Sequence, residues 1–251
     1  MYLKVLRLDY LFSVLIPVFF AIYINDLPIL NYIKLIGGWI FIGISGNLLN
    51  DIKDQDRDLP FTNNHLKAMF LICLFFGVLL MLDTFIANYL NLVFFLITVI
   101  LVVLYCLKIK KYPIINKFVL VFSHIILPYL IIKIPVFGNP EFFGEISLLI
   151  GVFFFSFASQ IIHEISDAEA FTKFSKKISR ILILSFSIIS IVFFIFTIIL
   201  FLDIYLIPLV AAPIGIIFLF RIPITPNSTH KKAGILVGNL LLFYIIILVI
   251  S

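Results

Sequence analysis

Long apolar runs with almost no charge are the feature that most limits how this chain can fold. Each run is close to the roughly 20 residues that a helix needs to cross a bilayer. Nine spans of that length use roughly 180 of the 251 residues, which leaves no room for a separate soluble domain. The composition, 63% hydrophobic and 12% charged, agrees. The expected spans are 9–24, 33–49, 66–82, 92–107, 118–134, 145–163, 181–202, 204–220 and 233–250. The sequence therefore predicts an all-α, polytopic membrane protein with nine transmembrane helices in a single domain, residues 1–251.

The placement of the positive charges predicts the orientation of these spans. Cytoplasmic loops of membrane proteins carry an excess of Lys and Arg. If the N-terminus is cytoplasmic, sixteen of the eighteen Lys and Arg residues lie in cytoplasmic segments, and only Lys34 and Lys133 do not. We therefore predict a multi-pass protein of the cell membrane with a cytoplasmic N-terminus. The net charge of +5 then reflects topology, and no nucleic-acid partner is expected.

The carboxylates are concentrated in two clusters, each at the predicted cytoplasmic end of a span. We name 50–58 the first acidic motif and 163–169 the second acidic motif. Asp51, Asp54 and Asp58 are spaced i, i+3 and i+7, which places them on one helix face. Glu164 and Asp167 share a face in the same way. Like charges so arranged repel, so cations are expected to compensate them. A solvated loop is the plain alternative, whereas carboxylates that meet a phosphorylated substrate are typical of Mg²⁺ sites.

The first acidic motif resembles a signature of a known family. Asn50-Asp51-x-x-Asp54-x-x-x-Asp58 is similar to the N-D-x-x-D-x-x-x-D signature of the UbiA superfamily of intramembrane prenyltransferases. The second acidic motif resembles that family's second aspartate motif, which also comes four helices later. Residues 105–111 resemble its Tyr-Ser-x-x-x-Lys stretch. The resemblance covers essentially the whole chain and implies a UbiA-like bundle of nine helices.

The same resemblance implies an activity and a set of site residues. It implies a Mg²⁺-dependent enzyme that ionises an isoprenyl diphosphate within the membrane and transfers the prenyl chain to a lipophilic acceptor. The implied catalytic residues are Asp51, Asp54, Asp58 and Asp167. The implied metal ligands are Asn50, Asp51, Asp54, Asp58, Glu164 and Asp167. The candidate substrate-binding residues are Arg57, Lys108, Lys110, Tyr105, Lys53 and Lys173.

Three departures from the family pattern leave the acceptor open. Glu164 stands where many relatives have Asp. Phe171 stands where the last acid of the second motif is usual, so that one metal contact is either missing or supplied by Glu169. The residues after Asp58 lack the Arg-Pro-Leu stretch that members with aromatic acceptors often show.

Three alternative functions remain open from the sequence. A membrane terpene cyclase would use the same metal clusters on a prenyl diphosphate without any acceptor. A transporter would use the acids for coupling, but transporters place such residues near the middle of the bilayer, and these clusters lie at span ends. A non-catalytic relative would not need the complete first acidic motif that this chain carries.

Overall fold

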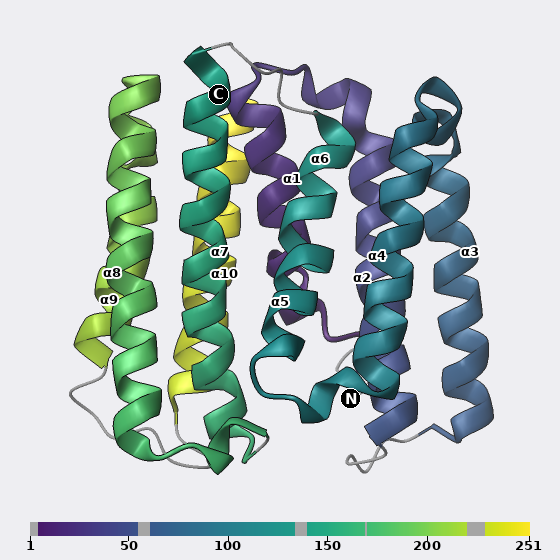
Figure 1. Cartoon of the computed structure of the whole chain (residues 1–251). Coiled ribbons are helices and arrows are strands. Elements are labelled where there is room, and N and C mark those ends of the chain that lie inside the picture. Colours follow the sequence, from purple (N-terminus) through teal and green to yellow (C-terminus); the bar gives the residue numbers. More distant parts are fainter. Residues whose placement is uncertain (1–4, 55–60, 134–139, 169, 220–228) are drawn as a thin grey trace. The chain divides into compact units, whose positions relative to one another are not determined.

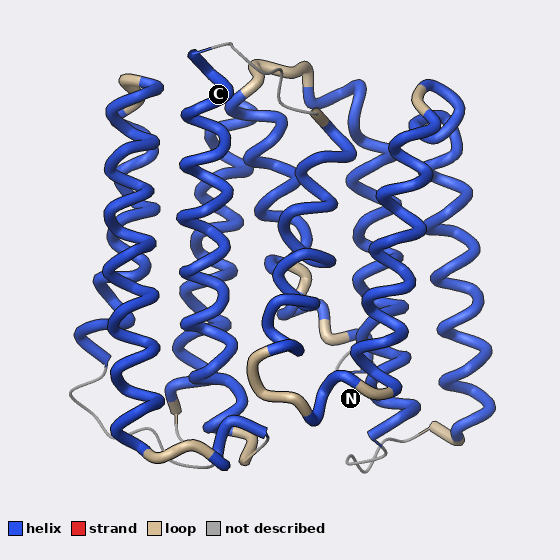
Figure 2. Tube along the Cα trace, in the orientation of Figure 1, coloured by secondary structure: helices blue, strands red, loops and turns tan. Residues whose placement is uncertain are grey.

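The computed structural model describes residues 5–54, 61–133, 140–168, 170–219 and 229–251. All regular structure in these residues is helical, and short loops join the helices (Figure 2). Seven of its helical segments are long and apolar enough to cross a membrane, and two shorter apolar helices accompany them. Seven and two make nine, and each corresponds to one predicted span. The all-α, polytopic architecture predicted from the apolar runs is therefore confirmed.

The helices fall into two compact units, which are described separately. The first unit comprises Met1–Ile109, Phe122–Lys133 and Leu242–Ser251. It contains α1, α2, α3, α4 and α6, labelled in Figure 1. Their bounds are Phe12–Ile24, Ile33–Asp54, Asn63–Ala87, Tyr89–Leu107 and Leu127–Ile132. A π-helical turn, Phe122–Ile126, leads into α6. Such turns are rare and are frequently found at functional sites.

The second unit comprises Lys110–Val121 and Ile134–Leu241. It contains α5, α7, α8 and α9, with bounds Ile115–Val121, Pro140–Ser166, Lys176–Phe201 and Ile207–Leu219. The last helix, α10, runs over His230–Ile250, and its residues up to Leu241 belong to this unit. Short one-turn helices, Ala170–Lys173 among them, connect the longer ones.

Polar residues at the helix starts explain several of the boundaries. Thr62 precedes α3, and its hydroxyl oxygen accepts a hydrogen bond from the backbone N–H of His65 at 3.4 Å. Ser175 caps α8 in the same way through the N–H of Ile178 at 3.3 Å. Side-chain acceptors at this position satisfy donors that have no partner within the helix. The caps therefore define where these two spans begin.

Small residues let neighbouring helices approach closely within each unit. In the first unit α2 and α3 lie side by side (Figure 1). A Cβ atom on Gly77 would lie only 2.7 Å from Ile42 Cδ1. In the second unit a Cβ atom on Gly151 of α7 would lie 2.6 Å from the Phe194 ring of α8. Helix association in lipid depends on such close packing, because lipid tails are as apolar as the side chains.

Many large apolar side chains lie on the outside of the helices. Phe75 on α3 is 63% exposed and Phe243 on α10 is also 63% exposed. Soluble proteins rarely expose contiguous apolar surface on this scale. The exposed faces are what a bilayer covers, and they support a multi-pass membrane protein.

Candidate active site

The first acidic motif begins on the last turn of α2. Asn50, Asp51, Lys53 and Asp54 all lie there, and α2 ends at Asp54. Asp51 is buried, Asn50 and Asp54 are half-buried, and Lys53 is exposed. Arg57 and Asp58, which were predicted to complete this part of the site, lie outside the described residues.

Asp51 is held by an arginine from the start of the chain. The guanidinium of Arg7 donates a hydrogen bond to Asp51 Oδ1 and forms an ion pair with it. Arg7 has a φ angle of 46°, in the left-handed region that a residue with a side chain rarely adopts. The guanidinium also lies over the ring of Tyr10, 5.9 Å from its centroid. Arg7 is therefore the expected compensating cation in this motif, although the sequence pattern did not single it out.

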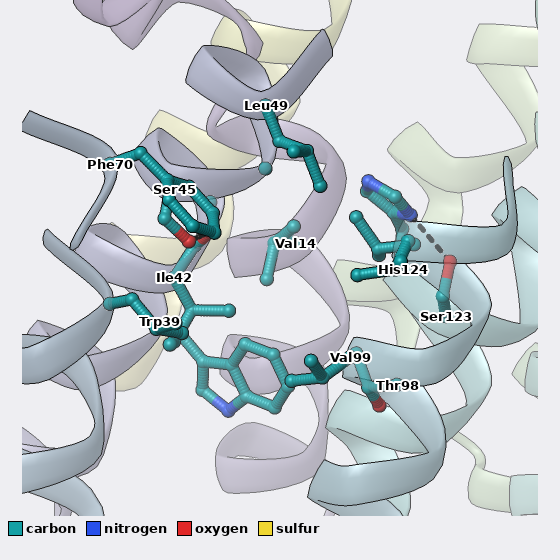
Figure 3. A pocket seen from close by; sticks show the side chains of 15 residues that line it. Val14, Trp39, Ile42, Ser45, Leu49, Phe70, Thr98, Val99, Ser123 and His124 are labelled. Atoms are coloured by element: carbon teal, nitrogen blue, oxygen red, sulfur yellow. Dashed lines mark hydrogen bonds between the residues drawn. The ribbon is translucent and has the colours of Figure 1, made fainter. Parts of the chain in front are cut away.

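An apolar pocket lies beside the same helix, and we name it the α2 pocket (Figure 3). It has a volume of about 50 Å³. Its walls come from α1, α2, α3, α4 and the π-helical turn, and they include Trp39, Gly46, Leu49, Val99 and His124. On α2 the wall runs from Trp39 up to Leu49, which immediately precedes Asn50 and Asp51. The α2 wall of the pocket and the start of the first acidic motif are therefore consecutive on one helix, within one unit.

Few polar groups face the α2 pocket. His124 lies on the π-helical turn, and its Nδ1 is 2.8 Å from the hydroxyl oxygen of Ser123 (Figure 3). Trp39 is 1% exposed, and its indole N–H has no hydrogen-bond partner among the described residues. A buried indole usually finds an acceptor. The lining of the pocket is therefore mainly apolar.

The second acidic motif lies at the C-terminal end of α7, where Glu164 is buried in an ion pair. The ammonium group of Lys117, on α5, is fully buried and contacts Glu164 Oε1. The side-chain amide of Asn116 donates to the same oxygen at 2.6 Å, and the backbone N–H of Phe171 donates to Oε2 at 3.1 Å. Both carboxylate oxygens of Glu164 are therefore already occupied by donors from within the unit.

Asp167, one turn later, is more accessible. Lys231 on α10 donates to its two carboxylate oxygens at 2.8 and 2.6 Å, and His163 Nδ1 lies 3.1 Å from Oδ2. Partial burial opposes ionisation, but the hydrogen bonds and positive charges of His163 and Lys231 outweigh it and lower the pKa of Asp167 below the usual value. A group with a lowered pKa stabilises the fold at neutral pH, and that contribution is lost only in acid. Asp167 therefore carries a negative charge over the physiological range.

Phe171 packs into an aromatic cluster and does not take the place of an acid. Its side chain is fully buried, and its ring centroid lies 4.9 Å from that of Phe174. It lines an apolar cavity of about 100 Å³ together with Phe118, Phe157 and Phe186. We name this cavity the phenylalanine pocket. Glu169, the other residue expected to supply the missing acid, lies outside the described residues.

The remaining candidate residues occupy varied positions. Tyr105 is half-buried near the end of α4, and Lys108 is exposed at the helix cap. Lys110 is half-buried in the short turn Ile109–Lys111, where its backbone carbonyl accepts a hydrogen bond from the Asn116 side chain at 3.0 Å. Lys173 is exposed in the turn that contains Phe171.

The donor atoms of both acidic motifs suit Mg²⁺, which prefers oxygen ligands. Within the described part of the chain, no group of three or more His, Cys, Asp or Glu residues is arranged to hold a metal ion. The carboxylates that continue the motifs, Asp58 and Glu169, fall outside that part. The carboxylate and amide oxygens of the two motifs fit Mg²⁺ because they are the type of ligand that this ion prefers.

Comparison with known proteins identifies the fold. No protein-family model and no curated protein matches the sequence. A solved structure from a study of digeranylgeranylglyceryl phosphate synthase in membranes matches the fold with a TM-score of 0.64 and 20% sequence identity. The alignment covers 99% of this chain and 97% of that one. In fold, the chain is therefore similar over nearly its whole length to that structure, which confirms the fold that the resemblance of the acidic motifs implied.

Proposed function

We propose that this chain is an intramembrane prenyltransferase that ionises an isoprenyl diphosphate and transfers the prenyl chain to a lipophilic acceptor. The observation that carries the proposal is the placement of the α2 pocket. It is apolar, and its wall on α2 ends at Leu49, next to Asn50 and Asp51. An isoprenyl diphosphate has the matching layout, with an apolar chain joined to a highly charged head. The fold similarity to a prenyltransferase supports the same reading.

The charged head would be bound by the acidic motifs and by nearby lysines. Asp51, Asp54, Asp58 and Asp167 are the proposed ligands of Mg²⁺, with Asn50 beside them. When bound, Mg²⁺ neutralises the diphosphate and makes it a better leaving group. Lys53 and Lys108 are exposed and free to reach phosphate oxygens as point charges. Arg57, Lys110 and Lys173 are further candidates for the same role, and Tyr105 is a candidate for contacting the substrate.

The chain's own residues would then protect the reactive centre. In the reaction the bond between C1 of the prenyl chain and the diphosphate oxygen breaks, and diphosphate leaves with the electron pair. A nucleophilic atom of the acceptor bonds to C1 and loses its proton. The apolar walls of the α2 pocket exclude water, which would otherwise trap the cation as an alcohol.

A product analysis tests the proposal directly. Purified protein is incubated with Mg²⁺ and geranyl, farnesyl or geranylgeranyl diphosphate, with and without a lipid or aromatic acceptor, and the extract is examined by mass spectrometry. We expect diphosphate release to depend on the acceptor. A cyclic hydrocarbon or alcohol released at a catalytic rate without acceptor would show a terpene cyclase instead. No turnover under any of these conditions would contradict both activities.

Filling the α2 pocket is expected to change the preferred chain length. Gly46 lines the pocket, and a Cβ atom added there would make ordinary contact with Val102 at 3.7 Å, so Gly46→Leu is the variant chosen to fill the pocket. We expect kcat/KM for farnesyl and longer donors to fall about 10- to 100-fold, and that for geranyl diphosphate to fall less, because single methylene groups are discriminated on this scale.

The matched control for this prediction is Gly215→Leu on α9. Gly215 is exposed, and a Cβ atom there would meet nothing within 4 Å. Its kcat/KM should stay within about twofold of wild type for every donor, since typical effects of surface substitutions are small. An equal loss for all donors in Gly46→Leu would count against the α2 pocket as the chain-binding site.

A further inference from the structure

We infer that Glu164 is a positioning residue, locked to Lys117, and that it is not one of the metal ligands. The inference deepens the proposed function, because it concerns which residues of the second acidic motif would meet the metal. It departs from the sequence expectation, in which Glu164 and Asp167 were equivalent ligands. The structure places these two acids in different surroundings, although they are only three residues apart.

Both carboxylate oxygens of Glu164 already accept hydrogen bonds in a buried setting. Glu164 is 4% exposed, and Lys117 is fully buried. Lys117 and Asn116 both donate to Oε1, and the Phe171 N–H donates to Oε2. A metal ion approaching Oε1 would have to displace a buried ammonium group, which would then remain without its counter-charge. Breaking a buried ion pair in this way is strongly unfavourable.

The contacts of Glu164 also hold the elements around Asp167 in place. Lys117 and Asn116 tie Glu164 to the beginning of α5, and the Phe171 N–H ties it to the turn that follows α7. Along the chain, Asp167 lies between Glu164 and Phe171, which this last hydrogen bond joins. Its own partner, Lys231, is 26% exposed, so the carboxylate of Asp167 can exchange partners. Glu164 thus holds the end of α7 in place, and Asp167 is the acid available to the metal.

Four purified proteins distinguish a positioning role of Glu164 from a role as a metal ligand. They are the wild type, Lys117→Met, Glu164→Gln and the double variant Lys117→Met/Glu164→Gln. Each single change leaves one buried charge without a partner, whereas the double variant removes both charges. The glutamine side-chain oxygen can still accept hydrogen bonds from Asn116 or Phe171. The pair Lys34 and Asp83 is the matched control, because it is an ion pair of 2.6 Å in which both side chains are 70% exposed.

The melting temperature of the unliganded protein is the first readout. We expect each single variant to melt roughly 10 °C lower than wild type and the double variant to recover most of that loss. The control cycle, Lys34→Met with Asp83→Asn, should show almost no coupling, because exposed pairs contribute little. A double variant that melts no higher than the single variants would overturn the inference.

The second readout is the Mg²⁺ concentration that gives half of the thermal stabilisation in the presence of inorganic diphosphate. A positioning role predicts that this concentration rises about tenfold in each single variant and returns to within about twofold of wild type in the double variant. A ligand role predicts an equal rise in Glu164→Gln and in the double variant, and that result would overturn the inference. A wild type that does not respond to Mg²⁺ would contradict the proposed metal dependence, and the melting temperatures alone would then decide whether the pair locks α7.

Discussion

Replacing Asp54 by Asn is expected to reduce turnover about 10³-fold while the protein remains folded. Asp54 is half-buried on the last turn of α2, on the same helix face as Asp51. The substitution keeps the size of the side chain but removes a carboxylate from the proposed Mg²⁺ site. Charge stabilisation by such a metal is worth several kcal/mol in the transition state, and about 4 kcal/mol corresponds to a 10³-fold loss of rate. The rate of diphosphate release, with the prenyl diphosphate and Mg²⁺ both saturating, measures this loss of turnover.

Asp83→Asn is the matched control for this prediction. It makes the same chemical change on α3, where Asp83 is exposed and paired with Lys34. Both turnover and melting temperature should stay close to wild type, because an exposed ion pair contributes about 0–1 kcal/mol. If Asp54→Asn retained near wild-type turnover, or if the wild type were active in excess chelator, the proposed metal site would be wrong.

Asp51→Asn should differ from Asp54→Asn in one measurable respect. Asp51 is buried and paired with Arg7, so the variant leaves a largely buried guanidinium without its counter-charge. We expect it to lose turnover as Asp54→Asn does, and also to lose stability, because breaking a buried pair costs about 3–5 kcal/mol. For this reason Asp54→Asn is the cleaner test of the chemistry.

The membrane spans were predictable because each is a local property of the sequence. A helix within the bilayer must satisfy its backbone internally and present apolar side chains, so hydropathy alone locates it. The predicted ends of the spans fell short of the ends of the helices. The span expected at 33–49 continues as α2 to Asp54, and the span expected at 145–163 continues as α7 over Pro140–Ser166. Hydropathy detects only the part of a helix at hydrocarbon depth, and here the polar continuation carries the acidic motifs.

The partners of the acids were not predictable individually, because they are distant in the sequence. Compensating cations were expected, but Arg7 is 44 residues from Asp51, and Lys117 is 47 residues from Glu164. In the sequence, Lys117 is only one of the sixteen Lys and Arg residues in predicted cytoplasmic segments. A signal did exist, since Lys117 directly precedes the predicted span 118–134, and a charge at that boundary needs either solvent or a partner.

The orientation of the N-terminus, the single domain and the roles of the site residues stay predictions.

Replacing Phe171 by Asp is expected to prevent stable folding, although it would restore the acid that relatives of the second acidic motif usually carry. The Phe171 ring is fully buried among Phe157, Phe174 and Phe186. Losing a buried Phe side chain costs about 3–5 kcal/mol, and an unpaired carboxylate in its place adds a further desolvation cost. The new acid would also lie close to Glu164, which accepts the Phe171 N–H.

The yield of folded, monodisperse protein and its melting temperature measure this effect, with Phe171→Leu as the control. Leucine keeps the site apolar with a modest loss of volume, so that variant should fold and respond to Mg²⁺ as wild type does. A side chain at position 171 could either face the metal site or form part of an apolar wall. Burial in the phenylalanine pocket favours the wall. A Phe171→Asp protein that melts within a few degrees of wild type and binds Mg²⁺ more tightly would instead place this position at the metal, and with it reverse the division of roles between Glu164 and Asp167.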